Sequence, residues 1–370
     1  MGPFAVRSRT FAVAAFLGCL LLARPTRADA IPYFAHEYGF SCQVCHSVIP
    51  QLTTFGETFE ARGFAIPGAR RQRVFPIALK LNLADTSEPD SSGLPKATLD
   101  EVELFVAGRI GSRGNYFVEQ YAVDGGRPGS TRDAWLAYRV TPDDARVPLT
   151  LRAGAFTLPL PFDPESFRES LAHDRIFDQR VGPNPFTFFD AKMGGEIRVG
   201  ALDRGTSVAL LALGGHEAQS GIAAHGIDTM LVAQHVLGAV TLSAYRYAGA
   251  RPIASGLDRF SRTGYGLAYR AGAFEAQGVL QTGTDGRIDA TGMAAGSSGG
   301  FAQVRYAFTP RLFALLRYDG TNDPTNGFAR DILPLVGYRL THNSRLTIED
   351  LITHAPTAKH VLGVQYTVAY

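Results

Sequence analysis

Residues 361–370 read VLGVQYTVAY, and this stretch decides the fold. Apolar or aromatic residues occupy every second position from Leu362 to Tyr370, and small or polar residues fill the positions between them. A period of two is that of a β-strand, whose successive side chains point to opposite faces. Such a strand, about ten residues long with one apolar face, is typical of a membrane-spanning β-barrel.

The same alternation recurs from Val74 onward in segments of about ten residues. It predicts sixteen strands, an even number as in single-chain bacterial barrels. They cover residues 74–84, 100–111, 115–123, 131–140, 148–156, 191–200, 206–215, 227–237, 239–248, 263–271, 273–283, 300–308, 310–320, 332–340, 344–353 and 361–370.

The predicted connections alternate between short and long, as short periplasmic turns and long outer loops would. A soluble β-sandwich also alternates apolar and polar residues, but it has no reason to keep this rhythm. We therefore predict an all-β fold over residues 73–370, an antiparallel transmembrane β-barrel of about sixteen strands. The closing Tyr370 also resembles the terminal signal read by the barrel-insertion machinery.

Charged residues fall on the parity opposite to the apolar face. An Arg or Lys in hydrocarbon costs about 2–4 kcal/mol, so this register points the charges into the lumen, which we expect to be wet. They are Lys80, Glu101, Glu103, Asp133, Arg139, Arg152, Glu196, Arg198, Arg246, Arg270, Glu275, Arg305, Arg317, Arg339, Arg345 and Glu349.

The longest connection, residues 157–190, holds five Pro. Asp163 and Pro164 predict a helix start, with Asp163 as N-cap and Pro164 at the first helical position. Loops of this length in a compact fold are usually functional, and we expect this one to fold into the lumen and narrow it.

Residues 1–30 read as a secretory signal peptide. Arg7 and Arg9 precede the apolar run at residues 11–23, and small residues at Ala28 and Ala30 provide a cleavage site after Ala30. The segment carries four Arg and one Asp, so a chain of net charge +2 becomes about −1 after cleavage. Such a charge, without a Lys/Arg run, argues against nucleic-acid binding. No later stretch has the roughly 18 consecutive apolar residues of a membrane helix.

Two cysteines then remain, in Cys42-Gln43-Val44-Cys45-His46. This spacing is the attachment signature of one covalent haem c, in which Cys42 and Cys45 form thioethers and His46 is the proximal iron ligand. A structural disulfide is the main alternative. A thioredoxin-like pair would need a βαβ context, and zinc would need two more matching ligands. Leu52, Phe55 and Phe59 predict a short helix after the motif, which Gly63 would end.

Residues 31–68 resemble the fused monohaem cytochrome–porin family, whose best-known members are outer-membrane iron oxidases. His36 departs from this pattern, which has Lys or Arg there, and the chain is short for the family. The resemblance implies an outer-membrane protein of a Gram-negative bacterium that transfers electrons, with iron(II) oxidation as a special case. The matching residues are Pro32, Phe34, Ala35, Cys42, Cys45, His46, Pro50, Leu52, Phe55, Gly56, Phe59, Gly63 and Phe64.

Residues 31–72 are too few to enclose a haem alone, so we expect this α-helical haem segment to plug the lumen from the periplasmic side. His36 is our candidate for the distal iron ligand. The sequence then predicts electron transfer across the outer membrane, between an extracellular redox partner or metal ion and a periplasmic electron carrier. The alternative is a porin in which the segment only gates or stabilises a barrel surrounded by outer-membrane lipid.

Overall fold

The computed structural model describes most of the chain after the predicted signal peptide. The described residues are 32–48, 51–62, 64, 66, 68–69, 75–89, 95–142, 145–162, 168–214, 225–288, 292–325, 327–354 and 358–369. The signal peptide, the helix start at Asp163 and Pro164, and Tyr370 lie outside these residues.

Among the described residues, sixteen long antiparallel strands form one closed barrel, which confirms the predicted fold class. The strands are β3 (Ile77–Pro89), β4 (Pro95–Ile110), β5 (Gly114–Asp124), β7 (Thr131–Arg139), β8 (Leu149–Phe156), β9 (Lys192–Ala201), β10 (Thr206–Leu213), β11 (Asp228–Leu237), β12 (Val240–Ile253), β13 (Gly256–Ala271), β14 (Phe274–Asp285), β15 (Ala295–Ala307), β16 (Leu312–Asp323), β17 (Gly327–Thr341), β18 (Ser344–His354) and β19 (Ala358–Ala369). A short piece, β6 (Arg127–Pro128), pairs with the end of β5.

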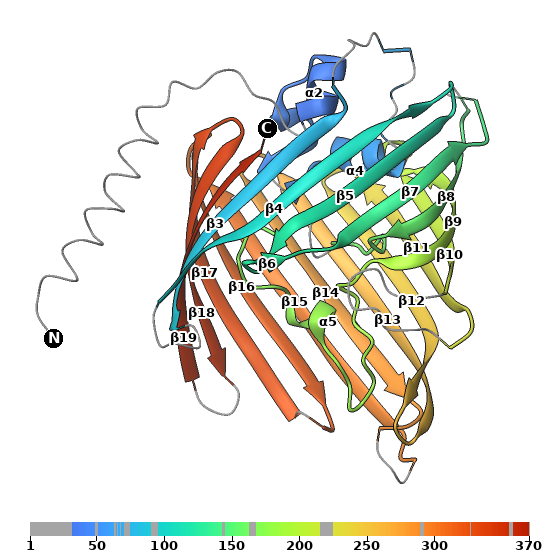
Figure 1. The fold of residues 1–370 in the computed structure, drawn as a ribbon, viewed down its shortest axis with the longest axis vertical. Helices are drawn as coiled ribbons and strands as arrows, with labels where there is room; N and C mark the ends of the chain where they lie inside the picture. Colours follow the sequence, from blue (N-terminus) through green and yellow to red (C-terminus); the bar gives the residue numbers. More distant parts are fainter. Residues whose placement is uncertain are drawn as a thin grey trace, which may run out of the picture.

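The barrel closes where β19 pairs with β3, with Val368 opposite Leu81. Each strand otherwise pairs with its sequence neighbours, so the wall is a simple up-and-down meander (Figure 1). A closed sheet satisfies all its backbone hydrogen bonds without an exposed edge. No helix in the described ranges is long and apolar enough to cross a membrane.

Several strands run further than the alternation predicts. The predicted loop at residues 249–262 is instead a paired extension of β12 and β13, which ends with Ile253 opposite Gly256. Alternation marks only the part of a strand that has one face in an apolar environment. Where both faces of a hairpin meet polar surroundings, the pattern fades and sequence reasoning places the strand end too early.

Side chains on the outer face of the wall are apolar and exposed. Leu280 on β14 is 72% exposed, whereas its neighbour Val279 points inward and is 1% exposed. Of the charged residues predicted to face the lumen, Arg246 is the exception, because it lies exposed between the buried, inward-facing Tyr245 and Tyr247. The outward apolar surface is what a lipid-embedded barrel requires.

Protein occupies much of the lumen among the described residues, so many of the polar side chains that face it are buried. Inward-facing side chains such as Glu103, Arg317 and Thr367 are each 1% exposed. Two segments occupy the space: the N-terminal helices α2 (Pro32–Tyr38), α3 (Cys42–Cys45) and α4 (Thr54–Ala61) at one mouth, and the loop after β8 with its short helix α5 (Arg175–Asp178). Figure 1 shows α2 and α4 at the upper mouth and α5 inside the cylinder.

Because outward-facing side chains meet lipid, a charged residue at such a position should lower the stability of the folded barrel. Leu280→Arg should destabilise the barrel by about 2–4 kcal/mol more than Leu280→Ala, because Arg pays desolvation that Ala does not. Urea titration of the folded barrel in lipid vesicles measures this difference. Equal stability of the two variants would show that β14 does not present this face to lipid.

Candidate functional site

The N-terminal segment, residues 32–64, has an internal core that positions the Cys-x-x-Cys turn. Thr53 caps α4, and its side chain accepts a hydrogen bond from the backbone N–H of Gly56 at 3.1 Å. The same residue joins α4 to the turn, since its N–H donates to the Cys45 carbonyl at 2.9 Å and its hydroxyl donates to the Val44 carbonyl at 2.8 Å. A Cβ on Gly56 would lie 2.3 Å from the Cys45 carbonyl oxygen, so only glycine permits this approach.

The predicted motif forms a single helical turn followed by strand β1 (His46–Val48), which pairs with β2 (Gln51–Leu52). A helical turn places residues three apart on one face, which suits two thiols that bind one group. Cys45 and His46 are partly buried. The side chains of Cys42 and His36 lie outside the described parts of the chain, although their backbones belong to α3 and α2.

The donor set of this turn fits haem c, because two thiols and an adjacent imidazole are the groups that a c-type haem uses. Haem attachment stays a prediction here. Among the described side chains, no group of three or more His, Cys, Asp and Glu is arranged to hold a metal ion.

An aromatic cluster forms the core of the N-terminal segment. Phe34 stacks on Phe64 with ring centroids 4.4 Å apart, and Phe59 meets both rings edge-on. Of the predicted apolar stripe after the motif, Leu52 and Phe59 are buried, whereas Phe55 is 39% exposed. The predicted helix is present as α4 and ends at Ala61, close to the expected stop at Gly63.

Polar contacts between described residues join the segment to widely separated parts of the barrel wall near its short turns. Their distribution from the turn after β9 to β17 means that the segment lies across the mouth rather than beside it. They include Arg62 to Asp203 at 2.8 Å, Glu57 to Arg270 at 3.0 Å, Gln51 Nε2 to Glu275 at 2.8 Å, and Arg339 to the Ser47 carbonyl at 2.7 Å.

The loop after β8 folds into the lumen, as predicted, and one side of it is apolar. Its rings and aliphatic chains pack against inward-facing residues of β12 to β15. Phe186 lies 4.6 Å from both Tyr247 and Phe260, and Phe177 lies 6.1 Å from Phe301, measured between ring centroids. Burial of this aromatic surface against the wall stabilises the folded position of the loop.

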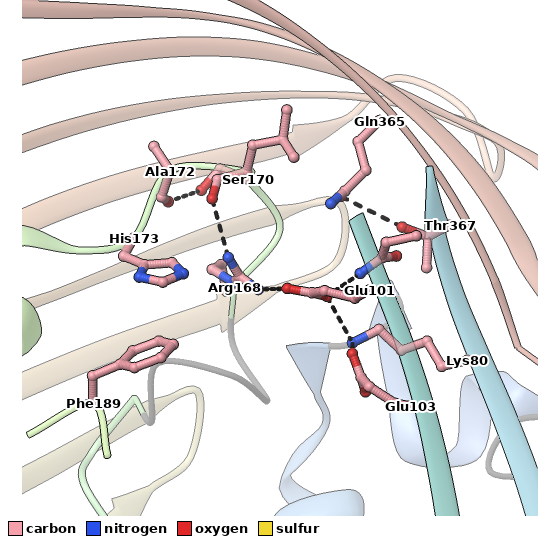
Figure 2. A network of polar contacts seen from close by, with 12 residues as sticks. Lys80, Glu101, Glu103, Arg168, Ser170, Ala172, His173, Phe189, Gln365 and Thr367 are labelled. Atoms are coloured by element: carbon pink, nitrogen blue, oxygen red, sulfur yellow. Dashed lines mark hydrogen bonds and ion pairs between the residues drawn. The ribbon is translucent and has the colours of Figure 1, made fainter. Parts of the chain in front are cut away.

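The other side of the loop is held by ion pairs. Arg168 reaches from the loop to Glu101 on β4 at 3.0 Å, and Lys80 on β3 lies 3.9 Å from Glu101 and 2.6 Å from Glu103. Figure 2 shows this network together with His173, whose ring stacks on Phe189 at 4.2 Å. The loop and the wall therefore neutralise one another's charges.

Arg317 on β16 is another enclosed anchor of the loop, at 1% exposed. It pairs with Asp174 of the loop at 3.1 Å and Asp319 of its own strand at 3.0 Å. It also donates to the Ser170 hydroxyl and to the Ala172 carbonyl at 2.9 and 3.1 Å. Removing one partner of a buried ion pair costs about 3–5 kcal/mol, because the other charge is left buried and unpaired, so the position of the loop depends on Arg317.

The methionines offer little to the N-terminal motif. Met193 is 46% exposed on the outer face and Met293 is 51% exposed, whereas Met230 is buried among the inward-facing residues of β11.

Sequence reasoning missed the wall residues Phe117 and Trp135, which contact the N-terminal segment. Their inward parity was visible, but no local pattern identifies their partner.

Comparisons with known proteins bear on the fold. No protein-family model matches the chain, and no curated protein is similar to it in sequence. An anion-selective porin from Comamonas acidovorans superposes with a TM-score of 0.59 and 12% identity, covering 80% of this chain and 98% of the porin. Salmonella typhi OmpF in complex with daunomycin gives 0.58 and 13%, covering 80% and 97%. OmpT of Vibrio cholerae gives 0.51 and 8%, covering 81% and 99%. The chain thus has a porin-like fold.

Glu169 of the loop makes its anchoring sensitive to pH. Burial raises the pKa of this carboxyl from 4.5 to about 7, and the Arg305 guanidinium 3.3 Å away offsets only part of the effect. The protonated form therefore stabilises the fold, fully below about pH 4.5, and this contribution is lost as the pH rises through about 7. Glu169→Gln should match the wild-type melting temperature at pH 4 and exceed it at pH 8.

Thermal melting followed by circular dichroism in detergent measures both proteins at both pH values. Thr187→Ala, in the same loop and without a titratable side chain, is the matched control and should shift the melting temperature equally at both pH values. A Glu169→Gln effect that does not depend on pH would contradict this assignment.

Proposed function

We propose that this chain is an outer-membrane β-barrel of the porin type that is closed at rest and acts as a gated channel for small polar solutes. The observation that carries this proposal is the burial of the inward-facing wall residues beneath the N-terminal segment and the loop. A sixteen-stranded barrel without such contents would enclose an aqueous channel.

The outward apolar surface and the short turns support one orientation of the barrel in the outer membrane. Short turns of bacterial barrels face the periplasm and long loops face outward. The N-terminal segment contacts residues beside the short turns, such as Asp203 and Arg270. In this orientation the segment is a plug, residues 32–64, at the periplasmic mouth.

The two barriers differ in how firmly they are attached. The two ion pairs of the plug involve partly exposed side chains, for example Asp203 at 42%, and exposed pairs contribute about 0–1 kcal/mol each. The Gln51 contact of the plug is buried. The loop is held by buried charges and by aromatic packing. We infer that the plug is the movable barrier and that displacing the loop requires more free energy than displacing the plug.

A second function is favoured by the Cys42-x-x-Cys45-His46 turn. When bound, haem c would supply a one-electron carrier at the periplasmic mouth. The two thiols would anchor it, His46 would be the proximal ligand, and His36 is the distal candidate. We propose electron transfer between a periplasmic electron carrier and an extracellular redox partner or metal ion, with iron(II) as the special case that the family resemblance suggests.

If the plug and the loop block the same channel one after the other, either of them alone should be enough to stop solute flux through the full-length protein. Glu57→Lys with Arg62→Glu places like charges against Arg270 and Asp203 and should weaken the plug, whereas Arg317→Ala should loosen the loop. Each change alone should leave solute flux near the wild-type level, and their combination should raise it at least tenfold. Swelling of protein-containing vesicles in small sugars measures the flux.

The matched control restores opposite charges by adding Arg270→Glu and Asp203→Lys to the plug variant. Combined with Arg317→Ala, this control should return the flux to the low level. High flux through the wild-type protein, or no rise in the combined variant, would contradict the gated channel.

Haem attachment has its own test. The processed wild-type protein should stain for covalent haem on a denaturing gel, and Cys42→Ala should lose most of the stain, because one thioether would be missing. The barrel should still fold, as shown by its heat-modifiable migration. A blank gel for the wild-type protein would remove the haem function and leave the channel.

If haem is present, stopped-flow reduction of the purified outer-membrane protein tests the iron special case. Reduction should be faster with iron(II) than with unrelated small reductants. Equal rates would remove iron(II) as the donor without affecting haem attachment.

A further inference from the structure

The backbone of Phe64 is strained. Its φ is 58°, and among the described residues it is the one non-glycine residue with a positive φ. A side chain in this region crowds the following carbonyl, so such a conformation persists only where its surroundings enforce it. Here the Phe64 N–H donates to the Phe59 carbonyl at 2.8 Å, and the Tyr38 hydroxyl donates to the Phe64 carbonyl at 3.2 Å.

The strained backbone directs the Phe64 ring from the plug to the barrel wall. The ring is buried, at 7% exposed. On the plug side it contacts Phe34 and Phe59. On the wall side its centroid lies 5.3 Å from that of Phe117 and 5.8 Å from that of Trp135, and it is stacked on the latter. Phe64 therefore joins the aromatic core of the plug to that of the wall.

The wall residues form a fixed receptor for this ring. Phe117 on β5 and Trp135 on β7 are directly opposite each other in the strand register. Trp135 is 4% exposed, and the Arg152 guanidinium lies 5.6 Å from its ring centroid. Arg152 is itself paired with Glu196 on β9. Because these residues belong to four neighbouring strands, β5, β7, β8 and β9, the receptor stays in place whether or not the plug is seated.

We infer that Phe64 is the latch of the plug: its ring, seated between Phe117 and Trp135, holds the plug in the periplasmic mouth, and its strained backbone keeps that hold reversible. This inference rests on the proposed gated channel and adds how the plug is held in the mouth. Ring burial favours the seated plug, whereas relaxation of the backbone favours the released plug. The polar contacts around the mouth then set the orientation of the plug.

Trp135 is the single Trp of the chain, so it reports on plug seating directly. In the wild-type protein its fluorescence should be only weakly quenched by acrylamide. Phe64→Ala removes the ring and should raise the population of the released plug roughly tenfold or more, which increases the quenching. Phe55→Ala is the matched control, because this exposed plug ring contacts Phe40 and Phe59 of the same segment, and it should leave the quenching unchanged.

The backbone strain has a separate test. Phe64→Gly lacks the ring, as Phe64→Ala does, but glycine adopts positive φ without the steric penalty. Relief of that penalty corresponds to roughly fivefold to thirtyfold in an equilibrium. Phe64→Gly should therefore seat the plug more often than Phe64→Ala, with correspondingly less quenching. If Phe64→Gly releases the plug as readily as Phe64→Ala, the backbone strain at residue 64 does not contribute to plug release.

A second measurement keeps the latch testable if haem alters the fluorescence. Trypsin added to the folded full-length protein should cleave after Arg62 faster in Phe64→Ala than in the wild type or in Phe55→Ala. Heat-modifiable migration confirms that each barrel is folded, and Phe64→Leu replaces the alanine variant if that one does not fold. Unchanged quenching and unchanged cleavage in the Phe64 variant would overturn the latch.

The two proposals fail separately. If the Phe64 variants release the plug, but adding Phe64→Ala to Arg317→Ala leaves vesicle flux at the wild-type level, the latch stands and the channel fails. If the combined charge variant conducts while Phe64→Ala leaves the plug seated, the channel stands and the latch fails.

Discussion

Closure of the sheet is the constraint on which the rest of this structure depends. Once β19 pairs with β3, every strand has two neighbours and two different faces. The outer face carries exposed apolar side chains, so charged and polar groups must point inward. A closed interior then has to satisfy those charges, either with water or with protein. In this chain the loop after β8 and the N-terminal segment provide the partners.

The interior consequently holds the loop in two ways. On β10 to β15, apolar inward residues such as Tyr247 and Phe260 pack against Phe186 of the loop, beside buried ion pairs such as Arg251 with Asp228. On β16 to β19, β3 and β4, ion pairs such as Arg168 with Glu101 hold the loop, beside apolar inward residues such as Leu333. The plug adds a third body, whose ion pairs with the wall are partly exposed and whose Phe64 ring is buried against the wall. Firm and weak attachment in one barrel is a physical basis for a gate.

The sequence predicts the barrel well because its evidence is local. Alternation from Leu362 to Val368 assigns the faces of one strand without knowledge of the rest, and sixteen such segments give the fold. It fails where both faces of a strand are apolar, as in residues 208–213, since inward Leu211 cannot then be distinguished from outward Leu210. The face assigned from alternation is wrong at Arg246, because Tyr247 occupies the inward position instead and its hydroxyl donates a hydrogen bond to Asp228.

The site is less predictable than the fold. The Cys42-x-x-Cys45-His46 spacing identifies a chemistry, and the structure places Cys42 and Cys45 on one helical turn with His46 at the start of β1, but haem attachment itself stays a prediction. The pairing of Phe64 with Trp135 joins residues far apart in sequence, and neither residue carries a motif. Single-channel recording of the wild-type protein in a planar bilayer tests the central claim most directly. We expect the single-channel current to stay at the closed level with only brief openings, whereas a steady, large open-channel current would contradict a channel that is closed at rest.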